Sequence, residues 1–412
     1  MAADAPVILG WARSPVAPRD GAFAALEPHG IGAPVVRALL ARAGVPAAAV
    51  DALVAGNALG AGGNPARMVA LAAGLPDACA ALSVDTQCCA GLDAVALAAG
   101  LLASGGARVT IAGGVEAWSR APIRQHRPRR AGEPPRAYDR PAFAPDPARD
   151  PDLLRAAARL AAAAGIERTA QDAFAIESHA RALAWRGRMA DEIVPLAGLA
   201  HDRYARALTP AQAARMPLAT RTDRRAPGPG SAIATDAHVD ADADAPPDDT
   251  DGSGAATAVS RLAVAPRADG AAFVLLATPD AARALGAVPR LRWRGAASTG
   301  CAPEWPMRAA LAASRAVLLR AGLEAPALWS VELHEAFAVQ ALDFRAALGL
   351  DPARMNRGGG GLGRGHPIGA SGAVSLVRLL ADMDREAPGG ALGLAAIAGA
   401  GGIGAAALVE RL

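Results

Sequence analysis

Two segments of the 412-residue chain carry side chains suited to covalent acyl chemistry: SVDTQCCAGLDA around Cys88 and GRGHPIGASGA around His366. Cys88 lies where a predicted strand, LSVDT, gives way to a predicted Ala/Leu helix from Cys89 to Ser104. A helix N-terminus favours the thiolate through its free N–H groups and its dipole, which makes such a sulfur a better nucleophile. The alternative is that Cys88 and Cys89 are small buried packing residues, the commoner fate of a free cysteine.

His366 favours the nucleophile interpretation, because a rigidly held imidazole can act as the base of a thiol. The glycines at 358 to 361, 363, 365, 369 and 372 each cost conformational entropy, so we interpret them as positions that packing alone does not explain and where the backbone closely approaches another group. His334, in VELHEAF, follows a predicted strand and is expected to open a helix, either facing the same cleft or capping that helix. One cysteine and two histidines would supply a nucleophile, a base and an oxyanion donor for acyl transfer.

The elements expected around these residues alternate between strands and helices, which is typical of an α/β fold. Strand and helix patterns alternate up to about residue 116, and they return after Asp269 with GAAFVLLAT, LRWRGAAS and LWSVEL as strands. The second half therefore echoes the first, and a chain of this length exceeds one typical core. The Pro/Arg-rich stretch 120–151 and the acidic run 235–254 are expected to be loops on either side of a helical insertion.

The charge and composition argue against several classes of function. The formal net charge is only +3, and the densest basic run, Arg124–Arg130, has no interleaved aromatic residues, so nucleic-acid binding is not expected. The chain contains no lysine, which rules out Schiff-base chemistry on a lysine. No metal site and no permanently bound cofactor are expected.

The cysteines and the apolar segments indicate a cytoplasmic protein. Cys79, Cys88, Cys89 and Cys301 show no C-x-x-C spacing, which favours a reducing compartment. The first residues, MAADAPVILGWARSP, show no targeting pattern. The uncharged run 389–409 is so rich in glycine that strands and turns are expected there and no membrane helix.

Six segments, in this order, resemble motifs of the thiolase superfamily, whose members move acyl groups between coenzyme A thioesters and carbon. They are WARSPVAPRDGAF, GNALGAGGNPARMVALAAGLP, SVDTQCCAGLDA, IAGGVEAWSRAP, HEAFA and NRGGGGLGRGHPIGASGA. The resemblance implies a five-layer α-β-α-β-α sandwich of two repeated halves with an inserted loop domain. On this basis we expect residues 1–120 with about 255–280 as the N-terminal half, 121–254 as the insertion and 281–412 as the C-terminal half.

The resemblance also implies roles for single residues. Cys88 would form the acyl-enzyme, and His366 would take its proton and then help to hold the thioester oxyanion. His334 stands where the family orients an oxyanion-hole donor, and the backbone N–H groups of Cys88 and Ala400 would form a second oxyanion hole. Gly365, Ser371, Gly401 and Gly402 are expected to contact the substrate, which is an acyl group delivered by coenzyme A or by an acyl carrier protein. Members of the family are homodimers or homotetramers.

One departure from the family bears directly on the chemistry. Its last motif, G-x-x-x-x-C-x-G-G-G-x-G, reads GLAAIAGAGGIG here, so Ala398 stands where a second cysteine would exchange the α-proton of the acyl group. Losing such a base typically costs about 10²- to 10⁴-fold in rate, unless Cys301, the hydroxyl of Ser371 or a water replaces it. The segment ATAVSRLAVAPRADGAA also lacks the serine and asparagine expected near the pantetheine.

Three functional hypotheses follow. The first is a thiolase-type acyltransferase that condenses acyl groups or cleaves 3-ketoacyl-CoA. The second is a condensing enzyme similar to decarboxylating ketoacyl synthases, which use a Cys-His-His set and need no α-proton base. The third is a non-catalytic paralogue that binds an acyl thioester.

Overall fold

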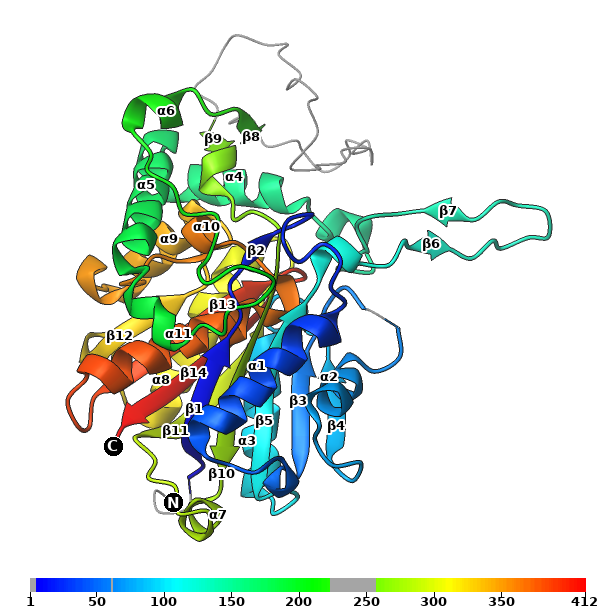
Figure 1. The fold of residues 1–412 in the computed structure, drawn as a ribbon. Helices are drawn as coiled ribbons and strands as arrows, with labels where there is room; N and C mark the ends of the chain where they lie inside the picture. Colours follow the sequence, from blue (N-terminus) through cyan, green and yellow to red (C-terminus); the bar gives the residue numbers. More distant parts are fainter. Residues whose placement is uncertain (1–4, 61, 223–256) are drawn as a thin grey trace.

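The computed structural model describes residues 5–60, 62–222 and 257–412, so the acidic run 235–254, which we predicted to be a loop, lies outside the described residues. Ten strands form one sheet in the order β12-β13-β14-β11-β1-β10-β5-β3-β4, with β2 pairing to β10 (Figure 1). These strands are β1 (Val7–Arg13), β2 (Ala17–Pro18), β3 (Ala52–Gly56), β4 (Ala80–Val84), β5 (Val109–Glu116), β10 (Ala268–Ala277), β11 (Leu291–Gly300), β12 (Leu328–Leu333), β13 (Leu392–Gly399) and β14 (Ile403–Arg411).

The sheet consists of two similar halves joined at a narrow seam. In the described part of the chain, strands β1 and β11 pair across it through Val7 with Arg292 and Ile8 with Leu291. In the first half β3 is parallel to β4 and β5, and β10 is antiparallel to β5 and β1. In the second half β12 is parallel to β13, and β14 is antiparallel to β13 and β11. The spatial order β3, β5, β10, β1 in the first half thus corresponds to β12, β13, β14, β11 in the second half, which confirms the predicted repeat.

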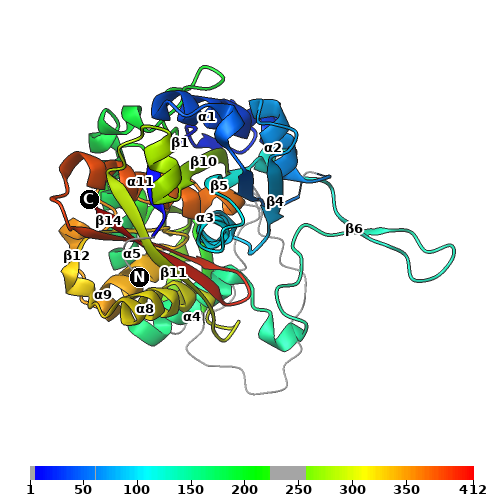
Figure 2. The same ribbon diagram turned by 90° about the horizontal axis from the view of Figure 1, so that it is seen from below.

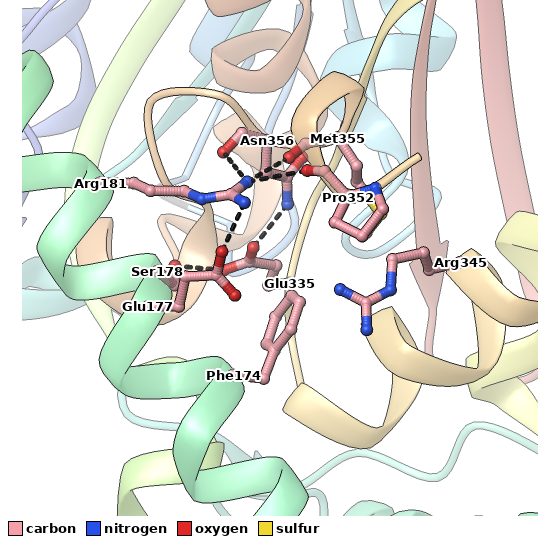
Figure 3. A pocket seen from close by; sticks show the side chains of 9 residues that line it. All are labelled: Phe174, Glu177, Ser178, Arg181, Glu335, Arg345, Pro352, Met355 and Asn356. Atoms are coloured by element: carbon pink, nitrogen blue, oxygen red, sulfur yellow. Dashed lines mark hydrogen bonds and ion pairs between the residues drawn. The ribbon is translucent and has the colours of Figure 1, made fainter. Parts of the chain in front are cut away.

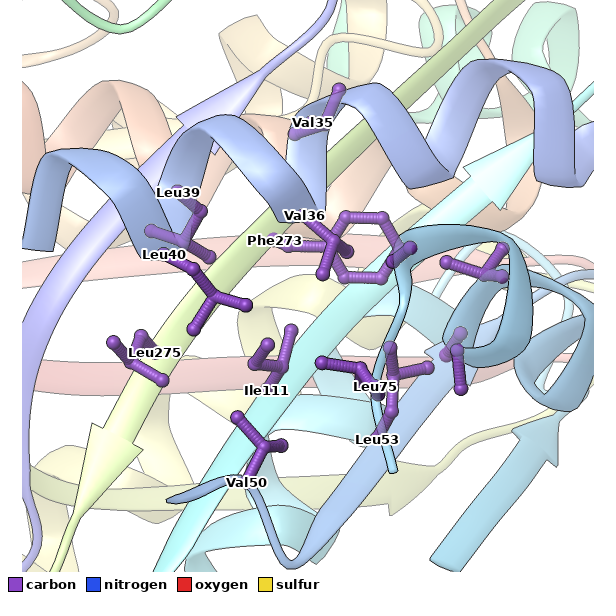
Figure 4. Packing of buried hydrophobic residues seen from close by; sticks show 14 of the residues in the cluster. Val35, Val36, Leu39, Leu40, Val50, Leu53, Leu75, Ile111, Phe273 and Leu275 are labelled. Carbon is purple, nitrogen blue, oxygen red and sulfur yellow. The ribbon is translucent and has the colours of Figure 1, made fainter. Parts of the chain in front are cut away.

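Helices cover both halves and fill the space between them. They are α1 (Pro28–Ala43), α2 (Pro65–Ala73), α3 (Ala90–Ala103), α7 (Pro279–Ala284), α8 (Ala309–Ala321), α9 (Ala338–Leu348), α10 (Gly361–Arg364) and α11 (Ser371–Glu386). Figure 4 shows α1 packing on the first half, with Val36 and Leu39 above Ile111 and Phe273.

The central layer is made by α3 and α11. Leu92 of α3 and Leu379 of α11 share one buried cluster with Val54 of the first half and Ile397 of the second. On the far side of the second half, α8 and α9 bury their apolar residues in a separate cluster with β12, β13 and β14. The layers therefore run α-β-α-β-α, as predicted. This order brings the carboxyl ends of strands from both halves toward the N-termini of the two central helices.

The segment between β5 and β10 adds a helical unit and a hairpin. Its elements are β6 (Gln125–His126), β7 (Arg136–Ala137), α4 (Leu153–Ala164), α5 (Arg168–Trp185), α6 (Pro210–Ala214), β8 (Leu218–Thr222) and β9 (Thr257–Ser260). The stretch 120–151, expected to be a loop, contains the β6–β7 hairpin, which projects far from the body (Figure 2). Helices α4 and α5 share a buried cluster with Phe337 and Leu362 of the second half. The domain boundaries proposed above stay predictions.

None of the helices in the described ranges combines the length and the apolar character needed to cross a membrane. The glycine-rich run 389–409 forms β13, a tight turn and β14, as the sequence indicated.

Candidate active site

Cys88 lies between the end of β4 at Val84 and the start of α3 at Ala90, at the predicted strand-to-helix junction. The preceding Gln87 has a φ of 54°, a left-handed conformation that costs free energy in a residue other than glycine and tends to occur at functional sites. The backbone N–H groups of Ala400 and of Cys88 itself act on the sulfur and lower its pKa, but burial outweighs them and raises the pKa of the thiol to about 12. The resting group is therefore a neutral thiol, and the thiolate expected from the helix N-terminus is not supported.

The tautomer of His366 is set by its hydrogen bond with Ser371. Its Nδ1 lies 2.7 Å from the hydroxyl oxygen of Ser371, and that hydroxyl donates to the carbonyl oxygen of Pro367 at 3.0 Å. Because the single hydroxyl proton is used there, Ser371 accepts from Nδ1–H, which leaves the lone pair on Nε2. Burial lowers the pKa of His366 to about 4. The ring is thus a neutral base whose free nitrogen is Nε2.

His334 and His366 lie side by side, with ring centroids 4.3 Å apart and ring planes inclined by 32°. Burial, and then the charges of His366 and Arg364, hold the pKa of His334 well below its usual range. Its Nε2 is buried without a hydrogen-bond partner among the described residues. Such a nitrogen is suited to contact an oxygen of a bound ligand.

The prediction that His334 opens a helix is wrong. Strand β12 ends at Leu333 and α9 begins only at Ala338, with Phe337 as its N-cap, so His334 belongs to the connecting loop. The helix-cap interpretation of this histidine is thereby removed.

The loop that carries His366 reaches Cys88 through a contact that only glycines allow. A Cβ on Gly56 or Gly91 would lie 2.6 Å or 2.8 Å from the carbonyl oxygen of Gly369, and one on Gly114 would lie closer still. Gly56 ends β3, Gly91 is in the first turn of α3, and Gly114 is in β5. Three glycines of the first half therefore leave space for the turn at Gly369 of the second half to pack beside the nucleophile.

Glu116, at the end of β5, anchors the same turn. Its Oε2 accepts the backbone N–H groups of Gly369 at 3.0 Å and Ala58 at 2.9 Å, and its Oε1 accepts from Asn57 Nδ2 at 2.7 Å. Burial raises its pKa to about 7 although these N–H groups oppose the shift. No role was predicted for Glu116 from the sequence, although it lies within the motif-like segment IAGGVEAWSRAP.

A second buried carboxylate, Glu335, follows His334 in the chain and is held by Ser178 and Asn356 (Figure 3). It accepts from the hydroxyl of Ser178 and from Nδ2 of Asn356, each at 2.6 Å, and the Ser178 hydroxyl oxygen accepts the N–H of Gly360 at 3.0 Å. A Cβ on Gly361 would lie 2.7 Å from Cε1 of His334. Helix α5 of the insertion, through Ser178, thus helps to set the position of the His334 ring.

These contacts revise our interpretation of the glycine run before His366. Gly360 packs on Glu335, Gly363 on the backbone of α5, and Gly365 on the ring of Tyr204, where a Cβ would lie 2.8 Å away. The run is explained by packing within the protein, contrary to our interpretation. Contact of Gly365 and Ser371 with substrate stays a prediction.

The turn between β13 and β14 brings Ala400, Gly401 and Gly402 to the site, the two glycines with φ of 80° and 78°. Ala398 lies on β13, paired with Gly404, and belongs to the cluster buried under α8 and α9. Cys301 follows the last residue of β11, and its backbone N–H donates to the carbonyl oxygen of Gly402 at 2.7 Å.

Two of the groups that could replace the missing cysteine are already engaged. The Ser371 hydroxyl is held by Pro367 and His366, and the Cys301 sulfur lies 3.6 Å and 3.7 Å from the carbonyl oxygens of Trp305 and Ala302. Burial also raises the pKa of the Cys301 thiol.

Residues 6–216 match the family model described as thiolase, N-terminal domain, and residues 288–411 match that of thiolase, C-terminal domain. The chain is 36% identical to the acetyl-CoA acetyltransferase of Rhizobium meliloti (strain 1021) and 35% identical to the probable acetyl-CoA acetyltransferase of Escherichia coli (strain K12), each over 98% of both chains.

Two solved structures share the fold over almost the whole length. The Bacillus anthracis acetyl-CoA acetyltransferase has a TM-score of 0.84 at 28% identity and covers 100% of both chains. The Acat5 thiolase from Ascaris suum, solved in complex with coenzyme A, has a TM-score of 0.82 at 26% identity and covers 99% of this chain and 100% of its own.

Proposed function

The chain belongs to the thiolase family, and from that premise we propose that this acyltransferase carries the acyl group of an acyl-CoA on Cys88, with His366 as its base. The observation that carries the proposal is the close contact of the Gly369 carbonyl with Gly56, Gly91 and Gly114, which brings the loop of His366 beside the first turn of α3. The backbone N–H groups of Cys88 and Ala400 also act on the Cys88 thiol and lower its pKa. Two such N–H groups are suited to stabilise a tetrahedral oxyanion.

Acylation begins from two neutral groups. His366 Nε2 takes the thiol proton while the sulfur attacks the thioester carbonyl, because a thiol with a pKa of about 12 is scarcely ionised at neutral pH. The N–H groups of Cys88 and Ala400 bind the oxyanion. The C–S bond to coenzyme A then breaks, and the proton on His366 passes to the departing thiolate. His334 provides a further contact for a substrate oxygen through its unpartnered Nε2.

The carbon–carbon step is the one that the alanine at position 398 affects. Ala398 has no group that exchanges a proton, and the Ser371 hydroxyl and the Cys301 thiol are already hydrogen-bonded to other groups. We therefore propose that acylation of Cys88 is fast and that condensation or thiolysis is slow, with water as the remaining base. The relatives do not favour the ketoacyl-synthase alternative or the non-catalytic alternative.

Intact-mass spectrometry after mixing with acetyl-CoA tests the proposal. We expect an acetyl adduct that is lost in Cys88→Ala and retained in Cys79→Ala and Cys301→Ala, whose cysteines are also free thiols. An adduct that survives Cys88→Ala, or no adduct at all, would contradict the role of Cys88. Replacing acetyl-CoA by the acetyl thioester of an acyl carrier protein tests which carrier delivers the acyl group, which we propose to be coenzyme A.

We also propose a homodimer or homotetramer, because β4 leaves an apolar edge of the sheet exposed. Leu82 of this edge strand is 45% exposed, and Met68 and Leu71 of α2 and Leu97 of α3 are exposed beside it. Leu82→Arg should yield monomers in light scattering. Leu319→Arg, on the distant helix α8, is the matched control and should leave the assembly intact.

The four cysteines are free thiols, which supports a reducing, cytoplasmic location. We propose that the coenzyme A thioester is a substrate and that no cofactor is held permanently.

A further inference from the structure

A buried glutamate and a buried arginine precede the two histidines, each by two residues. Glu332 lies near the end of β12 before His334, and Arg364 is the last residue of α10 before His366. Their side chains are 1% and 4% exposed, and Nη2 of Arg364 lies 3.8 Å from Oε2 of Glu332. A buried ion pair is often no more stabilising than apolar side chains of similar volume. Stability alone therefore does not account for this pair.

The guanidinium of Arg364 fixes the course of the glycine loop before His366. Its Nη2 donates to the carbonyl oxygen of Gly359, five residues earlier, at 2.6 Å. Gly359 has a φ of 73°, and a Cβ there would lie 2.3 Å from the carbonyl oxygen of Ser178, so its backbone packs tightly against α5. Gly359 is thus a fixed point from which Arg364 sets the path of the chain toward His366.

The strand that ends at His334 faces the same guanidinium. The N–H of His334 donates to the carbonyl oxygen of Ala396 at 2.9 Å, which continues the pairing of β12 with β13. Val331 and Leu333 lie in the cluster under α8 and α9, so Glu332 points to the opposite face of the strand, toward α11. Arg364 therefore joins the end of β12 to the loop whose His366 ring lies 4.3 Å from that of His334.

The charge of Arg364 acts on one histidine more than on the other. Burial, then His366 and then Arg364 hold the pKa of His334 below its usual range, whereas burial accounts for the lowered pKa of His366. Glu332 does not cancel this charge at neutral pH, because burial raises its pKa to about 8. A nearby positive charge disfavours an imidazolium at His334.

The other charged groups around Arg364 have partners of their own. Besides Glu332, the groups that act on it are Arg13 of β1, Asp202 of the insertion and Arg378 of α11. Arg13 and Asp202 pair with each other at 2.7 Å, and Arg378 pairs with Asp382 at 2.7 Å and also with Glu192. The carboxylate of Glu335, next to His334, is held by Ser178 and Asn356. Within the described ranges, Glu332 is the carboxyl group at ion-pair distance from Arg364.

Resting on the proposed function, we propose that Arg364 is a positioning residue of the acylation step. Its guanidinium holds the loop from Gly359 to His366 against the end of β12, and its charge keeps His334 neutral beside the imidazolium that forms on His366. The proton of the Cys88 thiol then moves to Nε2 of His366 alone, and it passes from there to the departing thiolate.

Arg364→Met in the full-length protein tests the inference, because methionine is unbranched and carries neither the donors nor the charge. Acetylation of Cys88 by acetyl-CoA, followed by intact-mass spectrometry, should slow at pH 7 by about 10- to 100-fold as the loop shifts. The acid limb of the rate, near pH 4 in the wild type, should move to higher pH, because His334 then competes for the proton.

Arg364→Lys separates the charge from the geometry, since it keeps a positive charge but lacks the planar fork of donors. It should leave the acid limb in its wild-type position and restore part of the rate. Arg168→Met is the matched control, because Arg168 of α5 also donates to backbone carbonyl groups, those of Ala213 and Met216. It should change neither the rate nor the limb.

If Arg364→Met does not fold, Arg364→Gln, which keeps an N–H donor without the charge, should show the same movement of the limb. An acid limb that stays near pH 4 in a neutral variant that folds would show a merely structural role and overturn this inference alone. Acetylation at the wild-type rate in Arg364→Met would overturn it too. A wild-type protein that forms no adduct on Cys88 would overturn the proposed function and this inference with it.

Discussion

Replacing Gly91 of helix α3 with alanine should displace the loop that carries His366. The added Cβ would lie 2.8 Å from the carbonyl oxygen of Gly369, against an ordinary contact of at least 3.4 Å, so the two must separate by 3.4 − 2.8 = 0.6 Å. The same Cβ would also lie 3.1 Å from Cβ of Ala373, in the first turn of α11, so the alanine side chain cannot relieve the contact by shifting toward α11. The turn 366–370 must therefore move relative to Cys88.

The expected magnitude combines two opposing effects. Overpacking a core typically costs about 1–3 kcal/mol, and alanine favours a helix over glycine by up to about 1 kcal/mol. We expect Gly91→Ala to reduce the free energy of unfolding by about 0–2 kcal/mol. Misplacement by 1 Å can cost about 100-fold in rate, so a shift of 0.6 Å should slow acylation of Cys88 on the order of tenfold.

Gly100→Ala in the same helix is the matched control, because nothing lies within 4 Å of its Cβ position. It should stabilise the protein by about 0.5–1 kcal/mol and leave the acylation rate unchanged. Urea unfolding measures the stability and intact-mass kinetics the acylation. If Gly91→Ala matched Gly100→Ala in both measurements, the close packing of the two halves at Gly369 would not control the site.

Three further outcomes are expected. The pKa values of about 4 for His366 and about 12 for Cys88 predict an acylation rate that is flat from about pH 5 to pH 9 and falls only below pH 5, as the imidazole becomes protonated. Because the pKa of Glu116 is about 7, a change of rate near pH 7 could come from Glu116 and would then disappear in Glu116→Gln. A change of rate near pH 7 that persists in Glu116→Gln would contradict the assignment of His366 as a base with a pKa of about 4. Burial raises the pKa of Glu332 to about 8 from a usual 4.5, so the free energy of unfolding decreases as the pH rises from about 4.5 through 8. In urea unfolding, the free energy of unfolding of Glu332→Gln should equal that of the wild type near pH 4 and exceed it by up to roughly 5 kcal/mol at pH 9. Ala398→Cys should raise acetoacetyl-CoA thiolysis by about 10²- to 10⁴-fold; no gain in a variant that still acetylates Cys88 would show that the missing sulfur is not what limits the reaction.

The repeated α/β architecture was predictable because its signals are local. Apolar runs such as LSVDT and GAAFVLLAT became β4 and β10, and the Ala/Leu pattern after Cys89 became α3 almost to the residue. The helix proposed to start at His334 was wrong because a loop of four residues, held by the buried Glu335, intervenes before Ala338.

The candidate site was recognisable as a set of residues, but its supports were not. Glu116 and Ser178 lie far along the chain from His366 and His334, and no local pattern marks a carboxylate or hydroxyl that accepts the N–H of a distant glycine. The glycines before His366 were interpreted as approaching a ligand because the groups that they contact are also distant along the chain. Their partners are helix α5 and Tyr204, which sequence spacing does not reveal.

Residue types and their order along the chain were enough to indicate a thiol and two imidazoles at strand ends, and a methyl group where a second thiol would exchange a proton. Only the tertiary structure decided how those groups are charged. Burial by both halves outweighs the N–H groups of Cys88 and Ala400, which favour the thiolate, and so makes Cys88 a neutral thiol; a serine hydroxyl leaves the lone pair of His366 on Nε2. Protonation depends on desolvation and on neighbours in space, and both arise only when the two halves pack together.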